Sequence, residues 1–133
     1  MNELETIKRI LAFKTIAVVG LSPKPERPSH GVAAYLQSQG YRIIPVNPGY
    51  DQILGEKSYA SLKDIPHQVE VVDVFRRSEA LPGIVADAIT IKAQAVWMQD
   101  GVTNEGAAKQ AQEAGLLVVM NDCMLRRHRQ LFG

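Results

Sequence analysis

The sequence predicts a doubly wound α/β sandwich, in which a five-stranded parallel sheet of strand order 3-2-1-4-5 carries helices on both faces. Two observations support this fold class. Five short apolar runs are rich in β-branched residues and almost unbroken by polar ones, as strands buried on both faces are. Segments with helical spacing separate these runs, and alternating β and α elements joined by right-handed crossovers build such a sandwich.

The elements follow one another regularly along the chain. The five strands are expected at residues 16–19, 41–46, 69–75, 95–98 and 116–120. The helices are expected at about residues 3–13, 32–36, 81–89, 107–114 and 122–131. The third helix fits the i, i+3, i+4, i+7, i+8 template of an amphipathic helix fully. Gly40 and Gly115 follow the second and fourth helices, where a C′ glycine is expected.

Residues 49–68 form a long connection with one short helix expected at 61–64. Its prolines and glycines are typical of ordered turns rather than of a linker. No repeat or low-complexity tract interrupts the sequence. We therefore expect residues 1–133 to form a single domain, since a chain of this length buries about two thirds of its unfolded surface in one core.

The composition limits the possible partners. Fifteen Lys and Arg residues against fourteen Asp and Glu give a net charge of +1, which predicts no general attraction to nucleic acid or to an anionic membrane. The single cysteine, Cys123, excludes an internal disulfide and a cysteine-based zinc site. No apolar stretch approaches the roughly 20 residues that span a bilayer. These features predict a cytoplasmic protein.

Ligands of such sheets bind beyond the carboxyl ends of the strands, where the strand order reverses, here between the first and fourth strands of the expected order. The loop after the first strand combines Gly20, the hydroxyl of Ser22, and the cations Lys24 and Arg27. The next helix is expected to begin with Ser29 as its N-cap, so that its free N–H groups face the same crevice. This loop favours a phosphate group, although a solvated loop whose charges bind nothing is the alternative.

The loop differs from a dinucleotide fingerprint. A dinucleotide site has two further glycines in this loop and an acidic residue at the end of the second strand. Here Ser22 and Pro25 stand at the glycine positions, and Asn47 ends the second strand beside Pro48. These departures argue against NAD and favour a nucleotide diphosphate that lies differently, although Asn47 is equally typical of a turn.

The sequence resembles the small stand-alone CoA-binding domain proteins, which are related to the Rossmann-like CoA-binding domain of the succinyl-CoA synthetase α subunit. The matching stretches run from about residue 4 to residue 131: "IAVVGLSPKPERPS", "GYRIIPVNP", "ILGEKSYASLKDIP", "VEVVDVFRRSEALPGIV", "KAQAVWMQDGVTNEGAAKQAQEAGLLVV" and "NDCMLRRHRQL". The resemblance implies a Rossmann-like domain that binds coenzyme A, or an acyl-CoA, in the crevice described above.

The resemblance also implies the residues of the site. The pyrophosphate loop corresponds to Gly20, Ser22, Pro23 and Lys24, which Arg27 follows in the same loop, and the loop near the nucleotide half corresponds to Asn47 and Pro48. The end of the third strand, which lines the cofactor, corresponds to Val74, Phe75 and Arg76. The edge of the fourth strand near the pantetheine arm corresponds to Trp97, Met98 and Gln99. Many relatives have Lys in place of Gly49 and Arg in place of Gly31, which implies a weaker grip on the 3′-phosphate here.

The remaining reactive residues have ordinary structural interpretations. Cys123 begins the last helix, where packing is favoured over an activated thiol. The three histidines (His30, His67 and His128) are expected at the surface, with no metal site, and the arginines Arg126, Arg127 and Arg129 on a solvated helix face. Asp73 and Asp100 form no evident acid/base pair. Trp97 is more typical of a core residue than of a stacking platform.

Three functions remain open on this basis. The first is a module that binds coenzyme A without chemistry of its own, alone, as a homodimer or with a larger CoA-using enzyme. The second is an acyl-CoA-dependent enzyme that uses Cys123 or an Asp. The third is an NAD-binding oxidoreductase domain, which Asn47 and the absent glycines disfavour. No catalytic nucleophile with an adjacent base is evident, so the binding module is favoured and no catalytic residue is assigned.

Overall fold

The computed structural model describes residues 1–133 and contains the expected parallel sheet of five strands. Its strands are β1 (Thr15–Val19), β2 (Arg42–Val46), β5 (Val71–Val74), β6 (Ala95–Met98) and β7 (Leu117–Val119). All pairings between neighbouring strands of this sheet are parallel. The Rossmann-like α/β fold class predicted from the sequence is confirmed.

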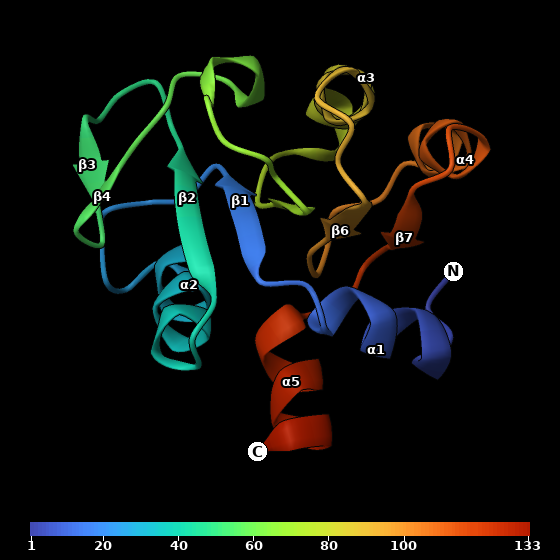
Figure 1. Cartoon of the computed structure of the whole chain (residues 1–133), viewed down its shortest axis with the longest axis horizontal. Coiled ribbons are helices and arrows are strands. Elements are labelled where there is room, and N and C mark those ends of the chain that lie inside the picture. Colours follow the sequence, from blue (N-terminus) through green and yellow to red (C-terminus); the bar gives the residue numbers. More distant parts are fainter.

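Helices cover both faces of the sheet, so the molecule has three layers (Figure 1). The helices are α1 (Leu4–Leu11), α2 (Pro28–Ser38), α3 (Leu81–Thr90), α4 (Glu105–Glu113) and α5 (Met124–Phe132). Figure 1 shows α3 and α4 above the sheet and α1, α2 and α5 below it. Two short 3-10 helices, η1 (Leu62–Asp64) and η2 (Ser78–Ala80), complete the structure, and η1 lies where a short helix was expected.

Each strand contributes alternate side chains to two separate cores. In β1, Ala17 and Val19 pack with α3 and α4, while Ile16 and Val18 pack with α1, α2 and α5. This alternation follows from the two-residue period of a strand. Because both sides are covered by helices, the strands need apolar residues at every position, which explains their unbroken apolar runs.

The predicted strand order is wrong. The sheet has the order β2-β1-β5-β6-β7, which is 2-1-3-4-5 when only its own five strands are counted. The third strand therefore lies between the first and the fourth, not outside the second. The outer edge of β2 is occupied by the connection that follows it, in which Tyr59 forms a single parallel bridge with Val46. The reversal of order falls between β1 and β5, which moves the expected crevice to that junction.

A small hairpin in this connection was not predicted. Strands β3 (Gln52–Ile53) and β4 (Glu56–Lys57) pair antiparallel through a two-residue turn. Both turn residues have positive φ, 54° at Leu54 and 75° at Gly55. Such a turn usually carries Asn or Asp before the glycine, so a leucine there gives little signal in the sequence.

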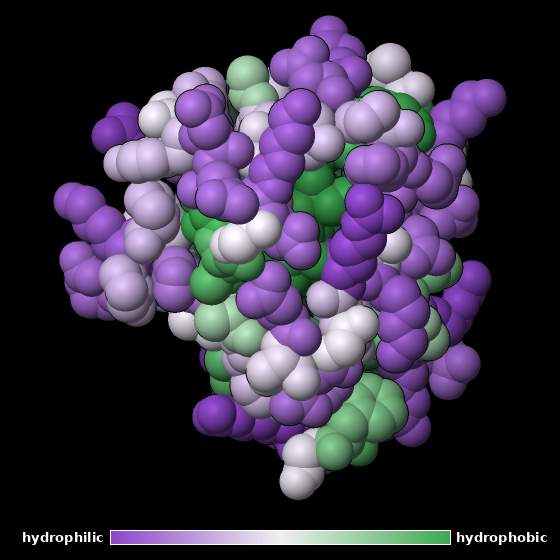
Figure 2. All heavy atoms as spheres, turned by 60° about the vertical axis from the view of Figure 1, so that its left-hand side comes forward, coloured by the Kyte–Doolittle hydropathy of each residue, from purple (hydrophilic) through white to green (hydrophobic).

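The surface around the hairpin is mainly polar. Figure 2 shows the face that includes the β2 edge, where hydrophilic side chains predominate and hydrophobic atoms are visible mostly in the hollows between them. The large hydrophobic residues that are exposed are Leu4, Tyr50 and Phe132, which are far apart in the sequence. No helix combines the length and the apolar character needed to cross a membrane.

Candidate functional site

The loop between β1 and α2 begins with a close approach to the end of β5. Gly20 has a φ of 88°, and a Cβ atom there would lie 2.5 Å from the carbonyl oxygen of Phe75. The backbone of Gly20 donates to the carbonyl of Val46 at 2.9 Å, and that of Phe75 to the carbonyl of Val19 at 2.9 Å. Only glycine permits this geometry, which fixes the loop at the reversal of strand order.

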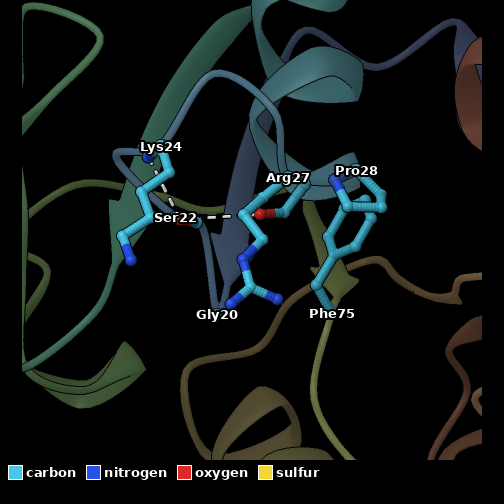
Figure 3. A pocket seen from close by; sticks show the side chains of 7 residues that line it. Gly20, Ser22, Lys24, Arg27, Pro28 and Phe75 are labelled. Carbon is cyan, nitrogen blue, oxygen red and sulfur yellow. Dashed lines mark hydrogen bonds between the residues drawn. The ribbon is translucent and has the colours of Figure 1, made fainter.

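Hydrogen bonds within the loop hold its polar groups in place. The backbone N–H of Ser22 donates to Oγ of Ser29 at 2.9 Å, and the N–H of Lys24 donates to Oγ of Ser22 at 3.1 Å. Figure 3 shows both bonds and the side chains around them. The first turn of α2 is thus tied directly to the loop that precedes it.

Helix α2 begins one residue after Arg27, which is its N-cap, so the prediction that Ser29 is the N-cap is wrong. Pro28 occupies the first turn, where its fixed φ and missing N–H suit a helix start. Ser29 lies inside the helix and uses its hydroxyl on Ser22 instead. The N-terminus of α2 nevertheless borders the crevice, as predicted, and its dipole favours an anion there.

These groups surround a cavity of about 320 Å³. We call it the phosphate cradle, and its lining residues are Gly20, Ser22, Lys24, Arg27, Pro28, Ser29 and Phe75. In Figure 3 the Arg27 guanidinium extends across the cavity in the direction of Gly20. Neither Lys24 nor Arg27 forms a salt bridge within the chain. The cradle therefore offers two free cations and a helix N-terminus to an anion.

A second cavity, of about 490 Å³, adjoins the cradle and shares Pro28 and Phe75 with it. We call it the apolar cavity, because Pro28, Val32, Phe75 and Val102 form much of its wall. Its complete lining is Pro28, Val32, Phe75, Arg76, Arg77, Gln99, Asp100, Val102 and Cys123. A long ligand with a charged end and a less polar arm fits such a pair of adjoining cavities.

A buried carboxyl group contacts a side chain of the apolar cavity. Asp73 on β5 is fully buried, and its Oδ1 accepts a hydrogen bond from Nε2 of Gln99 at 2.6 Å. Its Oδ2 has no hydrogen-bond partner. Burial raises the pKa of Asp73 to about 7, against the opposing effect of the Gln99 hydrogen bond. Asp73 therefore carries its proton at mildly acidic pH, which removes the cost of a buried charge.

The α5 face that carries Arg126 is exposed, as the sequence predicted, but Arg126 and the half-buried Arg127 are also paired with carboxylates, which was not predicted. Arg126 holds Asp100 through two hydrogen bonds of 3.0 and 3.1 Å and contacts Asp122 at 2.9 Å. Arg127 binds the other oxygen of Asp122 at 2.9 Å. Arg126 also lowers the pKa of Asp100. Asp100 thus faces the apolar cavity with its charge already balanced.

His128 is buried, not exposed as the sequence predicted. The residue is 6 % exposed, and its Nδ1 lies 2.8 Å from the Tyr35 hydroxyl oxygen. Burial lowers the pKa of His128, with a smaller contribution from Lys14. The inward face of α5 packs against α2, which takes this side chain out of solvent. No group of three His, Cys, Asp or Glu residues is arranged to hold a metal ion.

The predicted site residues divide into two groups. Seven of the thirteen line one or both cavities: Gly20, Ser22, Lys24, Arg27, Phe75, Arg76 and Gln99. Six line neither cavity: Pro23, Asn47, Pro48, Val74, Trp97 and Met98. For the three strand residues (Val74, Trp97 and Met98), position along the strand explains the difference, because their side chains point into a core.

Three of these residues belong to the cores. Val74, Trp97 and Met98 are fully buried, so their predicted contact with a ligand is not supported by this placement. The indole Nε1 of Trp97 donates to the carbonyl of Asp122 at 3.0 Å, which satisfies its only polar group. Trp97 therefore supports the β7–α5 junction as a structural residue.

Asn47 has a turn role. Its Nδ2 donates to the carbonyl of Leu21 at 3.0 Å, and its Oδ1 accepts from the backbone of Gly49 at 3.0 Å. Both ends of the amide are occupied, so the side chain links the second loop to the first one. It supports the crevice indirectly, and each end of its amide already makes one hydrogen bond to the backbone.

Several lining residues were not predicted to bind a ligand. They are Pro28, Ser29, Val32, Arg77, Asp100, Val102 and Cys123. Ser29 and Arg77 carried a signal, since they directly extend the predicted loop and strand end. Val102 and Cys123 come from the loops after β6 and β7, and only the fold brings them beside α2.

The fold and the cavities together define a class. A parallel α/β sheet with unpaired cations and a helix N-terminus at its reversal point is the arrangement of a domain that binds phosphorylated ligands. Comparison with known proteins gives the family: residues 14–129 match the model of the CoA binding domain, so the chain belongs to this family.

Three relatives illustrate the range of proteins similar to this chain. An uncharacterized Bacillus subtilis protein, YneT, is 46 % identical over 123 residues, which cover 92 % of this chain and 91 % of that protein. A hypothetical protein from Pyrococcus horikoshii has a solved structure with a TM-score of 0.93 and 47 % identity, over 97 % of this chain and 92 % of that one. The ADP-forming acetate–CoA ligase II of Archaeoglobus fulgidus is 33 % identical over 70 % of this chain, which is only 14 % of the ligase.

Proposed function

We propose that this chain binds coenzyme A or an acyl-CoA in the crevice between β1, α2 and the end of β5. The pyrophosphate lies in the phosphate cradle, where Lys24, Arg27 and the N-terminus of α2 meet it. The pantetheine arm runs along the apolar cavity past Phe75 and Gln99. The single observation that carries the proposal is the cradle of unpaired cations directly adjoining an apolar cavity, in a chain of the CoA binding domain family.

We further propose that binding is the function of the chain, without a reaction of its own. A nucleophile for acyl transfer needs a base within hydrogen-bond reach. Cys123 lines the apolar cavity, but its thiol has no histidine or carboxylate as a hydrogen-bond partner. A module of this kind presents or senses the cofactor.

The NAD-binding alternative receives little support. The amide of Asn47 binds backbone groups at both ends, and the end of β2 has no carboxylate to accept both hydroxyls of a ribose diol. The Gly20 loop also uses Ser22 to bind its own backbone where a dinucleotide loop would have glycine. These contacts favour a ligand whose phosphates, rather than its ribose, provide the main recognition.

Titration calorimetry with CoA, acetyl-CoA, NAD and ATP tests the proposal. We expect the CoA species to bind more tightly than NAD or ATP. Binding of NAD or ATP, with none of CoA or acetyl-CoA at millimolar concentration, would contradict it.

The variant Ser22→Asp tests the location of the ligand. Aspartate can still accept the N–H of Lys24, so the turn is kept, while its charge repels a phosphate. We expect loss of CoA binding with little change in melting temperature. The control Gln112→Glu adds the same charge at the exposed end of α4 and should leave CoA binding intact. Equal affinity in the two variants would place the ligand elsewhere.

A further inference from the structure

We propose that Cys123 exchanges with the disulfide of coenzyme A and retains one CoA as a mixed disulfide. The proposal rests on the proposed function, because the cradle must hold the phosphates of the incoming disulfide. It adds a covalent, reversible state to a site that otherwise only binds.

The position of Cys123 supports this reaction. Cys123 is half-buried, is the N-cap of α5 and lines the apolar cavity. That cavity shares Pro28 and Phe75 with the phosphate cradle. Coenzyme A has its phosphates at one end and its sulfur at the other. A molecule with phosphates in the cradle and its arm in the apolar cavity therefore carries its sulfur into the cavity that Cys123 lines.

Gln99 supplies an independent indication of the ligand. Its side chain lines the apolar cavity, although the residue is only 3 % exposed. Its Nε2 is used by Asp73, and its Oε1 has no hydrogen bond within the chain. Oδ2 of Asp73 is the fully buried side-chain atom that lacks a partner, so Oε1 of Gln99 reaches the cavity and can accept a hydrogen bond from a ligand there. The pantetheine arm carries amide N–H groups, so an arm beside Cys123 can satisfy Gln99.

Cations and a helix N-terminus lie near Cys123. Its side chain makes no capping hydrogen bond, so Sγ is not occupied. The first turn of α5 and the cations Arg76 and Arg77, which line the same cavity, attract the anionic CoA disulfide. The nearby Asp100 is balanced by Arg126. Disulfide exchange needs only a thiolate and access, in contrast to acyl transfer, which also needs a base.

The exchange is balanced without any further reagent. The Cys123 thiolate attacks one sulfur of the CoA disulfide, and a new bond forms between Sγ and that sulfur. The original sulfur–sulfur bond breaks, and the second CoA leaves as a thiolate that takes a proton from water. The CoA disulfide is the oxidant, and one of its halves is reduced.

Intact-mass spectrometry of the purified chain mixed with CoA disulfide measures the reaction. We expect a mass increase of one CoA less two hydrogens, reversed by dithiothreitol and absent in Cys123→Ser. Hydroxyethyl disulfide is the reference, since it has no phosphates. At equal micromolar concentration, CoA disulfide should react about 100-fold faster, because binding in the crevice raises its local concentration to the millimolar range.

Two variants test whether the rate of disulfide exchange depends on phosphate binding in the crevice. Ser22→Asp should lower the rate with CoA disulfide at least about tenfold, because the cradle no longer holds the phosphates. Gln112→Glu should react like the unmodified chain. Equal rates with the two disulfides, or an unreactive Cys123, in a protein that still binds CoA by calorimetry would overturn this inference and leave the proposed function standing. Failure of CoA binding itself would overturn both.

Discussion

Two groups of cations lie near the carboxyl edge of the same sheet, and their partners differ. Arg126 and Arg127 on α5 hold the carboxylates of Asp100 and Asp122. Lys24 and Arg27 before α2, and the pair Arg76 and Arg77 after β5, have no salt bridge at all. The first group stabilises the junction of β7 and α5. The second group leaves positive charge around the crevice, where an anionic ligand can use it.

Ion pairing separates the charges that stabilise the fold from those that are available to a ligand. A pair of opposite charges cancels its own field beyond a few ångströms, whereas unpaired cations attract an anion over about a Debye length of 10 Å. Sequence alone shows arginines of both groups next to strands or helix ends. Only the contacts of each guanidinium show which group it belongs to.

The largest expected effect concerns the buried carboxyl group of Asp73, which has no cationic partner. Asp73 is fully buried, and its raised pKa of about 7 means that the folded chain keeps the proton that the unfolded chain releases near pH 4. The free energy of unfolding should therefore fall as the pH rises from 4 to 7, by about 4 kcal/mol from this group. Asp73→Asn should remove this fall.

Urea unfolding of both chains across this pH range measures the effect. Because other groups titrate in the same range, the relevant quantity is the difference between Asp73→Asn and the unmodified chain. The variant should gain relative stability as the pH rises and reach a plateau above pH 7. A difference that does not depend on pH would mean that Asp73 stays charged, and that this carboxylate has a partner.

The next effect concerns the close contact between Gly20, at the start of the cradle loop, and the backbone of Phe75. In Gly20→Ala, the added Cβ would lie 2.5 Å from the carbonyl oxygen of Phe75, at a φ of 88°. Steric overlap and backbone strain together should lower the free energy of unfolding by about 3 kcal/mol. Gly40 has a similar φ of 93° but open space around it, so Gly40→Ala should cost only about 1 kcal/mol. If both variants lost the same free energy of unfolding, the contact between Gly20 and Phe75 would have no special role in stability.

A smaller effect separates the paired arginines from the free ones. Asp122→Asn removes the charge that Arg126 and Arg127 share and should cost about 2 kcal/mol in urea unfolding. Asp100→Asn removes a solvent-exposed partner of Arg126 and should cost less than about 1 kcal/mol. Both variants should still bind CoA. A large loss of affinity in Asp122→Asn would show that the α5 pairs also serve the ligand.

The last prediction concerns the free cations, whose substitution should change ligand binding rather than stability. Arg27→Gln should raise the Kd for CoA about tenfold, since a charged contact to phosphate is lost. Its melting temperature should stay unchanged, because Arg27 has no salt bridge to lose. Arg9→Gln on the exposed side of α1 is the matched control. If both variants bind CoA equally well, Arg27 does not contact the ligand.

Much of the crevice could be predicted from the sequence, because many of its residues are close together in the chain. Gly20, Ser22, Lys24 and Arg27 belong to one loop, whose strand-then-glycine start indicates a turn at the edge of a sheet. The residues from the strand ends were harder to predict. Phe75 and Gln99 reach a cavity, whereas Val74, Trp97 and Met98 are buried beside them. A shift of one residue turns a side chain to the other face, and the sequence does not give the end of a strand to that accuracy.

By itself, the sequence determined the alternation of strands and helices and the polar loop after β1, since both depend on local patterns of side chains. The tertiary structure decided three further points. Tyr59 pairs at the outer edge of β2, and β5 lies beside β1, so that the crevice falls at the β1–β5 junction. Arg126 and Arg127 of α5 pair with Asp100 and Asp122, which lie in two different loops. Cys123 and Gln99 came to line one cavity. Each depends on contacts between residues far apart in the chain, which no local pattern records.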